Sequence, residues 1–497
     1  MENFNNTKRR NKKFSEIRTF SVPLNREEKQ ERLTVDNNFS SKSYKEELIS
    51  KALKLHSQGN IKEAKKYYQS IIKKGFSDPK VFANYGVILK GLGKLQEAEQ
   101  SYRQALKINP NFAEAHSNLG SVLKGLGKLQ EAELSFSEAI KIKPDYAIAH
   151  YNLGNVLGDL GKLKEAEKSY QKAIEIKSDF ALAHYNLGMI LINLGNSYEG
   201  ELSLRKAIEI DPNLTCAVEQ LARHLYLNEK FNLAIEYLSK SKSDSCQSLY
   251  LSCLLCLDKE KEFYKKYNEI SQQKICNADM SGIIEHANII YEKRNDSYFC
   301  NEAIKYIFKE KINEELFSAA HFDQLISYLK SDELKTKPQA LIYKASQSTG
   351  NLFLLNYPFI KSLKKALEVK IELYKARFKD SKQGFIENWP KEYTLRSWIL
   401  SMKTGGFIKP HNHRYGWITG SFYLQVPKCN NNDNSGNISF SYQGPEYPTK
   451  GKKFDATIKK IDNRDICIFP SSLFHHTIPF KSTEERICLV FDLAKKS

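Results

Sequence analysis

Residues 112–144 of the chain read FAEAHSNLGSVLKGLGKLQEAELSFSEAIKIKP, and residues 146–178 read YAIAHYNLGNVLGDLGKLKEAEKSYQKAIEIKS. The second stretch repeats the first position by position, at an offset of 34 residues, the distance from Gly120 to Gly154. A period of this length is typical of a unit of two helices that is copied along the chain. The sequence therefore predicts a helical repeat in this region.

The same period continues on both sides of these two stretches. Small residues, aromatic residues and helix-ending prolines return to fixed places in each copy. They are Gly86, Gly120, Gly154 and Gly188; Ala98, Ala132, Ala166 and Gly200; Tyr102, Phe136 and Tyr170; Ala105, Ala139, Ala173 and Ala207; and Pro110, Pro144 and Pro212, with Ser178 in the remaining closing position. The small residues let two antiparallel helices approach closely, the aromatic residue fills the space between neighbouring pairs, and the proline ends the second helix.

This pattern resembles the tetratricopeptide repeat (TPR). One helix pair cannot bury its apolar face alone, so the resemblance implies an α-solenoid, a TPR superhelix of stacked pairs. Degenerate copies precede and follow the clear ones, and we expect about six units over residues 45–240. Residues 1–44 are polar and expected to be disordered, whereas residues 241–335 are expected to form an irregular helical connector.

One position of the repeat holds asparagine four times. The residues are Asn84, Asn118, Asn152 and Asn186. Asparagine is a poor helix former, so its recurrence at the same helical position of four repeats indicates a specific role. Similar TPR arrays line their concave face with such a ladder, whose amides bind the backbone of an extended peptide. The resemblance thus implies a protein or peptide partner on the concave face, and the alternative is that these amides bond neighbouring helices.

The local composition of the sequence changes after about residue 336. Short β-rich runs lie between Gly, Pro and Asn turns. They are Ser397–Met402, Trp417–Val426, Asn437–Tyr442, Asp465–Phe469 and Arg486–Leu493. Several short strands at this spacing indicate a barrel or a sandwich. We therefore expect a separate β domain over residues 336–497.

Two sequence blocks of the β domain concentrate histidine. His411 and His413 form an H-x-H pair, and His475 lies about 60 residues on, in Phe-Pro-Ser-Ser-Leu-Phe-His-His. Side chains alternate along a strand, so H-x-H on a strand would direct both imidazoles to one face. These three histidines are candidate metal ligands, and we expect His476, the next residue, to face away.

These blocks resemble the double-stranded β-helix oxygenases, a jelly-roll, cupin-like fold, that use Fe(II) and 2-oxoglutarate. The resemblance covers roughly residues 340–497. It implies Fe(II) on the three histidines, with 2-oxoglutarate and O2 as co-substrates and no catalytic side chain beyond the metal centre. Arg486, at the start of the last strand, would hold the far carboxylate of 2-oxoglutarate with its planar guanidinium. Tyr423 is a second candidate to bind the co-substrate, with core packing as the alternative.

The third metal ligand stays open at this point. Such sites usually combine two histidines with a carboxylate two residues after the first histidine, where this chain has His413. Either His413 binds the metal, or a distant carboxylate such as Glu446 does, or the site has only His411 and His475. Cupins share the fold, but the glutamate of their first block is missing here. The alternative function is a non-catalytic TPR scaffold with a degenerate cupin-like domain.

The overall composition narrows the choice of partners and location. A formal net charge of +18 would suit nucleic acid, but the excess comes largely from lysines scattered over helix surfaces and from an N-terminal basic run. A nucleic-acid partner is therefore not expected. No stretch of about 18 apolar residues is present, so no membrane span is expected. With no apolar leader at the N-terminus, the prediction is a cytoplasmic protein.

Overall fold

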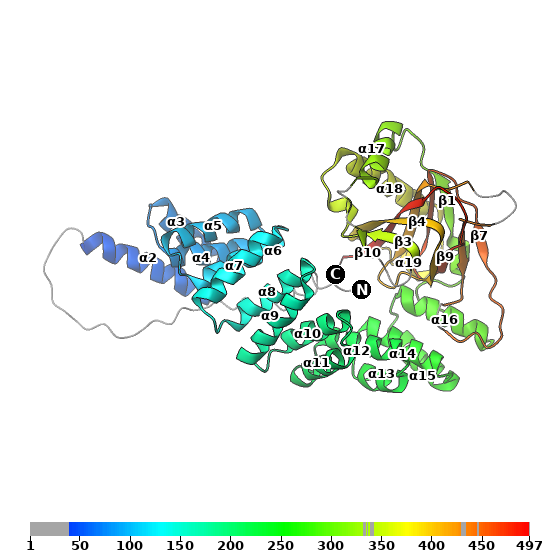
Figure 1. Cartoon of the computed structure of the whole chain (residues 1–497), viewed down its shortest axis with the longest axis horizontal. Coiled ribbons are helices and arrows are strands. Elements are labelled where there is room, and N and C mark those ends of the chain that lie inside the picture. Colours follow the sequence, from blue (N-terminus) through cyan, green and yellow to red (C-terminus); the bar gives the residue numbers. More distant parts are fainter. Residues whose placement is uncertain are drawn as a thin grey trace. The chain divides into compact units, whose positions relative to one another are not determined.

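The computed structural model (Figure 1) describes residues 39–331, 334, 336–337, 342–428, 434–444 and 447–496. Residues 1–38 of the segment expected to be disordered lie outside the described residues, and so does Glu446. Residues 39–44, for which disorder was also expected, belong instead to a helix that begins at Phe39. The chain divides into two compact units between Gln220 and Leu221. Among the helices described, none is both long and apolar enough to cross a membrane.

The first unit is a series of helix pairs, drawn in blue to green in Figure 1. The helices are α2 (Phe39–Ser57), α3 (Ile61–Lys73), α4 (Pro79–Gly91), α5 (Leu95–Ile108), α6 (Ala113–Gly125), α7 (Leu129–Ile142), α8 (Ala147–Asp159), α9 (Leu163–Ile176), α10 (Ala181–Asn193) and α11 (Ser197–Ile210), followed by α12 (Thr215–Leu227) at the boundary. This is the helical repeat array that the 34-residue period predicts.

In the repeats of Gly86, Gly120 and Gly154, the glycine packs directly on the aromatic residue of the same helix pair, whereas Gly188 packs on Leu204. A Cβ atom added to Gly154 in α8 would lie 2.7 Å from the ring of Tyr170 in α9, and one added to Gly120 would lie 2.9 Å from the ring of Phe136. Both rings are almost fully buried. The glycine therefore allows the two helices of the pair to pack closely, and any side chain at this position would displace a core ring.

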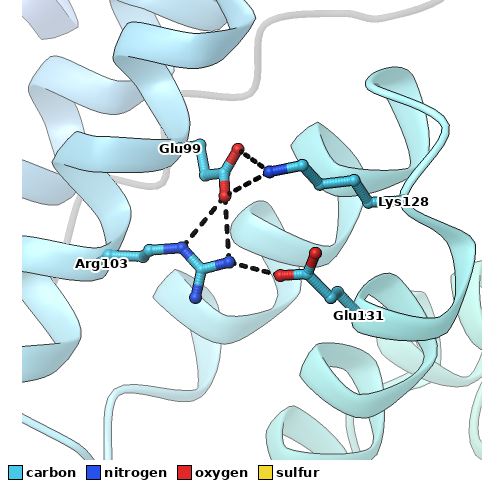
Figure 2. A network of polar contacts seen from close by, with 4 residues as sticks. All are labelled: Glu99, Arg103, Lys128 and Glu131. Carbon is cyan, nitrogen blue, oxygen red and sulfur yellow. Dashed lines mark hydrogen bonds and ion pairs between the residues drawn. The ribbon is translucent and has the colours of Figure 1, made fainter.

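Neighbouring helix pairs are joined by ion pairs, of which Figure 2 shows one network. Glu99 in α5 accepts hydrogen bonds from Arg103 one turn on and from Lys128, which precedes α7. Arg103 also pairs with Glu131 of α7 at 2.6 Å. Burial alone would raise the pKa of Glu99, but the two cations lower it overall. The network therefore links one repeat to the next.

The second unit begins with helices and continues into a sheet domain. Its helices after α12 are α13 (Phe231–Leu238), α14 (Asp244–Cys256), α15 (Glu260–Ser271), α16 (Ala278–Ile290), η1 (Ala303–Tyr306), α17 (Ala319–Leu329), η2 (Leu352–Leu354), α18 (Pro358–Arg377) and α19 (Gly384–Glu387). Helices α14, α15 and α16 share a core around Leu251, Phe263 and Ile283. The regular helices thus continue well past residue 240.

In the described residues of this unit, ten strands form one curled antiparallel sheet. The strands are β1 (Phe308–Lys311), β2 (Thr336–Lys337), β3 (Ile342–Ser348), β4 (Tyr393–His411), β5 (Ile418–Gln425), β6 (Ile438–Ser441), β7 (Thr457–Lys459), β8 (Asp465–Pro470), β9 (Phe474–Thr477) and β10 (Arg486–Lys495). Their order is β1-β8-β5-β10-β4-β9-β6-β7, with β2 on β3 and β3 on β4. This jelly-roll-like domain agrees with the expected fold class.

Strand β4 is long enough to belong to two parts of the sheet. Its first half pairs with β10, from Tyr393 opposite Lys495 to Met402 opposite Arg486. Its end pairs with β9, where His411 lies opposite His475. Because one strand spans both pairings, the end of β4 meets the F-P-S-S-L-F-H block at a defined register.

Candidate metal centre

The three predicted histidines lie together in the sheet domain. His411 is the last residue of β4, and His475 is the second residue of β9, directly opposite it. Their ring centroids are 4.4 Å apart, and each lies 5.2 Å from the ring centroid of His413. One ligand atom from each residue lies within 4.8 Å of the other two. A single metal ion could contact all three.

His413 reaches this cluster from a turn, whereas the sequence placed it on a strand. Strand β4 ends at His411, and the chain then turns, with Gly416 N–H donating to the His413 carbonyl at 2.8 Å. The His413 N–H donates to the carbonyl of Ser471 at 3.0 Å, in the block that leads to His475. The turn therefore brings the second histidine back beside the first by a different route from strand alternation.

Each imidazole is held through its Nδ1 atom. His411 and His475 direct Nδ1 to the carbonyls of Lys409 and Leu473, at 2.9 and 3.3 Å. His413 directs Nδ1 to Oδ1 of Asp492 at 2.8 Å. A metal-binding histidine commonly donates its other ring N–H to a carbonyl or carboxylate, which fixes the tautomer. In all three residues this leaves Nε2 as the nitrogen for a metal.

Electrostatics keep these rings in the form that a metal needs. Burial, together with the neighbouring His413, lowers the pKa of His411 to about 3. Burial and His411 hold the pKa of His475 well below the usual value for histidine. Only the neutral imidazole has a lone pair to give to a metal. Near neutral pH both residues are therefore ready to bind a cation without first losing a proton.

Arg486 is a fully buried cation on β10, with 1% of its surface exposed. Its guanidinium donates Nε–H to the carbonyl of Gly436 at 3.0 Å, contacts the thiol of Cys488, and lies 5.0 Å from the ring centroid of Tyr423. Within the described part of the chain, no carboxylate forms an ion pair with it. A buried cation in this state favours an anionic partner.

Strand geometry relates Arg486 to the histidine cluster. Residues two apart on a strand share a face, so Arg486, Cys488, Val490 and Asp492 lie on one face of β10. Asp492 on this face reaches His413. Arg486 and the cluster therefore lie on the same side of the strand, with Tyr423 of neighbouring β5 stacked against the guanidinium.

Sequence reasoning missed Asp492 and its partner Thr419. Thr419 is fully buried in β5 and donates its hydroxyl to Asp492 Oδ1 at 2.8 Å. The available signal was the run ICLVFDLA from Ile487, in which Asp492 is the one charged residue of an otherwise apolar stretch. Such a residue needs a partner, but its sequence neighbours offer none.

The asparagine ladder lies in the first helices of four repeats, and all four side chains are half-buried. Asn84 donates to the carbonyl of Lys80 in its own helix, at 2.8 Å. Asn186 donates to Asn155 and Tyr151 of the preceding repeat, at 2.7 and 3.3 Å. The structure describes no hydrogen bond from the side chains of Asn118 and Asn152. The four positions thus differ in what their amides contact.

Comparison with known proteins gives two kinds of match. Family models described as "TPR repeat" match residues 86–127, 122–161 and 154–195, and one described as "Tetratricopeptide repeat" matches residues 181–214. A model described as "Putative 2OG-Fe(II) oxygenase" matches residues 396–492. That last range contains His411, His413, His475 and Arg486. No curated protein matches the chain.

Several solved structures resemble the chain over about a third of its length. MamA has 25% sequence identity over 32% of this chain and 94% of its own, with a TM-score of 0.31. YrrB, titled a TPR protein with an unusual peptide-binding site, has 22% identity over 37% and 97%, with a TM-score of 0.33. A thermophilic TPR protein from Thermus thermophilus has 20% identity over 37% and 99%, with a TM-score of 0.30.

The sequence patterns, the two units of the fold and the family models agree. The chain carries tetratricopeptide repeats in its N-terminal half and a domain of the 2OG-Fe(II) oxygenase family at its C-terminus.

Proposed function

We propose that this protein is an Fe(II)- and 2-oxoglutarate-dependent hydroxylase whose TPR repeats bind a protein or peptide. The observation that carries the proposal is the cluster of His411, His413 and His475, whose ligand atoms lie within 4.8 Å of one another. Three ligands on one side of a non-haem iron leave positions open for a co-substrate and O2. Imidazole is a suitable donor for Fe(II), so the residues fit the ion that the family implies.

The chain's own residues would divide the work as follows. The three histidines hold the ion through Nε2, and the Nδ1 bonds keep the rings aimed at it. Arg486 pairs with the far carboxylate of 2-oxoglutarate, for which its buried guanidinium has unused donors. Tyr423 packs on that guanidinium and is the second candidate to bind the co-substrate. Bound Fe(II), 2-oxoglutarate and O2 would supply the oxidation that converts a substrate C–H bond to C–OH, with 2-oxoglutarate losing CO2 to give succinate.

The proposal is tested by anaerobic titration of the purified protein with Fe(II), with and without 2-oxoglutarate. We expect one Fe(II) per chain and a visible charge-transfer band that needs both components. Oxidative decarboxylation of 2-oxoglutarate in air would then show turnover. A protein that binds no Fe(II) under these conditions would contradict the proposal and favour a non-catalytic TPR scaffold.

A TPR array offers an extended face to a polypeptide, and this supports the second part of the proposal. The half-buried amides of Asn118 and Asn152 have donors and acceptors that suit any peptide bond. In this proposal the repeats select a polypeptide, and the sheet domain modifies it.

A further inference from the structure

Asp492 is a partly buried acid within an apolar strand, and its contacts are specific. Its Oδ1 atom lies 2.8 Å from Nδ1 of His413 and 2.8 Å from Oγ1 of Thr419. The side chains of Asp492 and His413 are only 15% and 8% exposed. The two residues are 79 positions apart, so the contact exists only because β10 and the turn after β4 meet in the fold.

The hydrogen bonds around Asp492 run in one direction. An ionised carboxylate can only accept, so His413 Nδ1–H and the Thr419 hydroxyl both donate to it. Thr419 has then used its one proton, and its contact of 2.8 Å with Ser471 must be a bond donated by the serine. Ser471 therefore donates to Thr419, Thr419 donates to Asp492, and Asp492 holds His413.

The fold makes room for this chain of hydrogen bonds. A Cβ atom on Gly416 would lie 2.4 Å from Oγ of Ser471, so only glycine lets the serine approach. The backbone of Ser471 also accepts from His413 N–H at 3.0 Å. Thr419 and Ser471 are 0% and 1% exposed, which excludes water from competing for these bonds. These hydrogen bonds are therefore shielded from water, and a backbone hydrogen bond also joins the first and last residues of the chain of bonds, Ser471 and His413.

We propose that Asp492, held by Thr419 and Ser471, is a positioning residue that makes His413 a metal ligand. It fixes the proton of His413 on Nδ1, so that Nε2 carries the lone pair. It also places a negative charge one imidazole away from the cation, in a site whose three neutral ligands contribute none. Such iron sites usually contain a carboxylate that binds the metal directly. Here Asp492 would supply that negative charge through His413, without binding the metal itself. This inference rests on the proposed metal site.

Asp492 could instead serve only the stability of the sheet, and Asp465 allows the two roles to be separated. Asp465 lies at the start of β8, is 1% exposed, and pairs with Lys309 of β1 at 2.8 Å. It is a buried, ion-paired acid of the same sheet, on a strand that contributes no histidine to the cluster. Asp465→Asn therefore measures the effect of removing a buried carboxylate without touching His413.

The test uses Co(II) as an oxygen-stable probe for the metal site in the full-length chain. Dissociation constants and visible d–d spectra would be measured for wild type, Asp492→Asn, Asp492→Ala, Thr419→Val and Asp465→Asn. We expect roughly 10–100-fold weaker binding and an altered spectrum for the two Asp492 variants, and a smaller change in the same direction for Thr419→Val. Asp465→Asn should lower the unfolding temperature while leaving the dissociation constant and spectrum unchanged.

Two results would overturn the inference, and they are distinguishable. If wild type binds Co(II) and both Asp492 variants bind it within about twofold with the same spectrum, Asp492 has only a structural role, and the proposed metal site survives. If wild type binds no metal, the proposed function fails and this inference fails with it. Should the Asp492 variants not fold, Thr419→Val decides, because an unchanged constant and spectrum there would contradict the positioning role.

Discussion

Two adjacent histidines, His475 and His476, differ in burial and in position because they lie on opposite faces of one strand. His475 is 6% exposed and lies opposite His411, whereas His476 is half-buried, outside the cluster of ligand atoms, and opposite Ser439. Neighbouring residues on a strand face opposite sides, so only one of the pair can reach the proposed metal site. His475 is therefore the candidate ligand, and His476 is a matched control next to it in the sequence.

We predict that His475→Ala abolishes Fe(II) or Co(II) binding, because it removes one of three ligands. His476→Ala should bind metal as wild type does. Metal content after gel filtration checks both, and far-UV circular dichroism should show the helical signal of the repeats intact in each. The opposite pattern, with metal lost only in His476→Ala, would contradict the assignment.

Arg486 supports a second prediction at this scale. Arg486→Lys keeps the charge but loses the planar fork, so 2-oxoglutarate should bind about 1.5–3 kcal/mol more weakly, tenfold or more in affinity. Metal binding should be unchanged, and turnover should recover partly at high 2-oxoglutarate. Arg377→Lys, on the exposed surface of α18, is the matched control. Equal affinity for 2-oxoglutarate in both variants would remove Arg486 from the co-substrate site.

Helix packing in the repeats depends on residues that have no side chain. A methyl group on Gly154 would meet the ring of Tyr170, whereas one on Gly91, the last residue of α4, would have nothing within 4 Å. The two glycines occupy similar helices in different surroundings. They therefore separate the effect of packing from the effect of helix propensity.

We predict that Gly154→Ala destabilises the array by about 1–3 kcal/mol, because the new methyl group forces the buried ring of Tyr170 to move. Gly91→Ala should be neutral or stabilising by up to about 1 kcal/mol, since alanine is the better helix former. Thermal or denaturant unfolding of the two variants checks this. Equal effects at both positions would show that the close contact does not limit packing.

The asparagine ladder supports a prediction about peptide binding. Asn186 bonds the preceding repeat, so Asn186→Ala should cost stability, roughly 0.5–1.5 kcal/mol. The Asn118→Ala, Asn152→Ala double variant should keep its stability, because the structure describes no hydrogen bond from either amide.

The same double variant should bind a polypeptide captured by the repeats about 5- to 150-fold more weakly, if each amide contributes roughly 0.5–1.5 kcal/mol. Uncoupled decarboxylation of 2-oxoglutarate should not change, because the sheet domain is untouched. Isothermal titration with the captured partner measures the first effect. Wild-type affinity in a folded double variant would show that these amides do not bind the peptide.

At the scale of the whole molecule, the sheet domain includes much that precedes its histidine blocks. Its core contains Phe299, Phe308 and Phe317, and β1 pairs with β8. Helix α16 lies against the segments that carry the histidine cluster: a Cβ atom on Gly282 would be 2.7 Å from the Ser472 carbonyl, and Asp279 accepts a hydrogen bond from Asn412 at 3.3 Å. The helices before the sheet are therefore part of the same packed body.

We predict that residues 221–497 fold and bind metal on their own, whereas residues 336–497 do not, because the shorter piece loses β1, α16 and part of the core. Residues 39–240 should remain helical alone, since solenoid units contact mainly their neighbours. Gel filtration, circular dichroism and Co(II) binding of the three pieces check this. A folded, metal-binding 336–497 piece would show that α16 and β1 are dispensable.

The sequence alone indicated the helical repeats, a β domain of the barrel or sandwich type, and the histidines that are candidates to bind a metal. Those features depend on patterns that can be read along the sequence: a 34-residue period, short β-rich runs between turns, and histidines in ordered blocks. The tertiary structure decided which side chains meet. The turn that returns His413, the acid of Asp492 beneath it and the approach of α16 come from strand register and close packing between segments far apart in the chain. Such contacts produce no repeating pattern in the sequence, because each contact occurs only once. The two residues of each contact come close together only when the chain is folded.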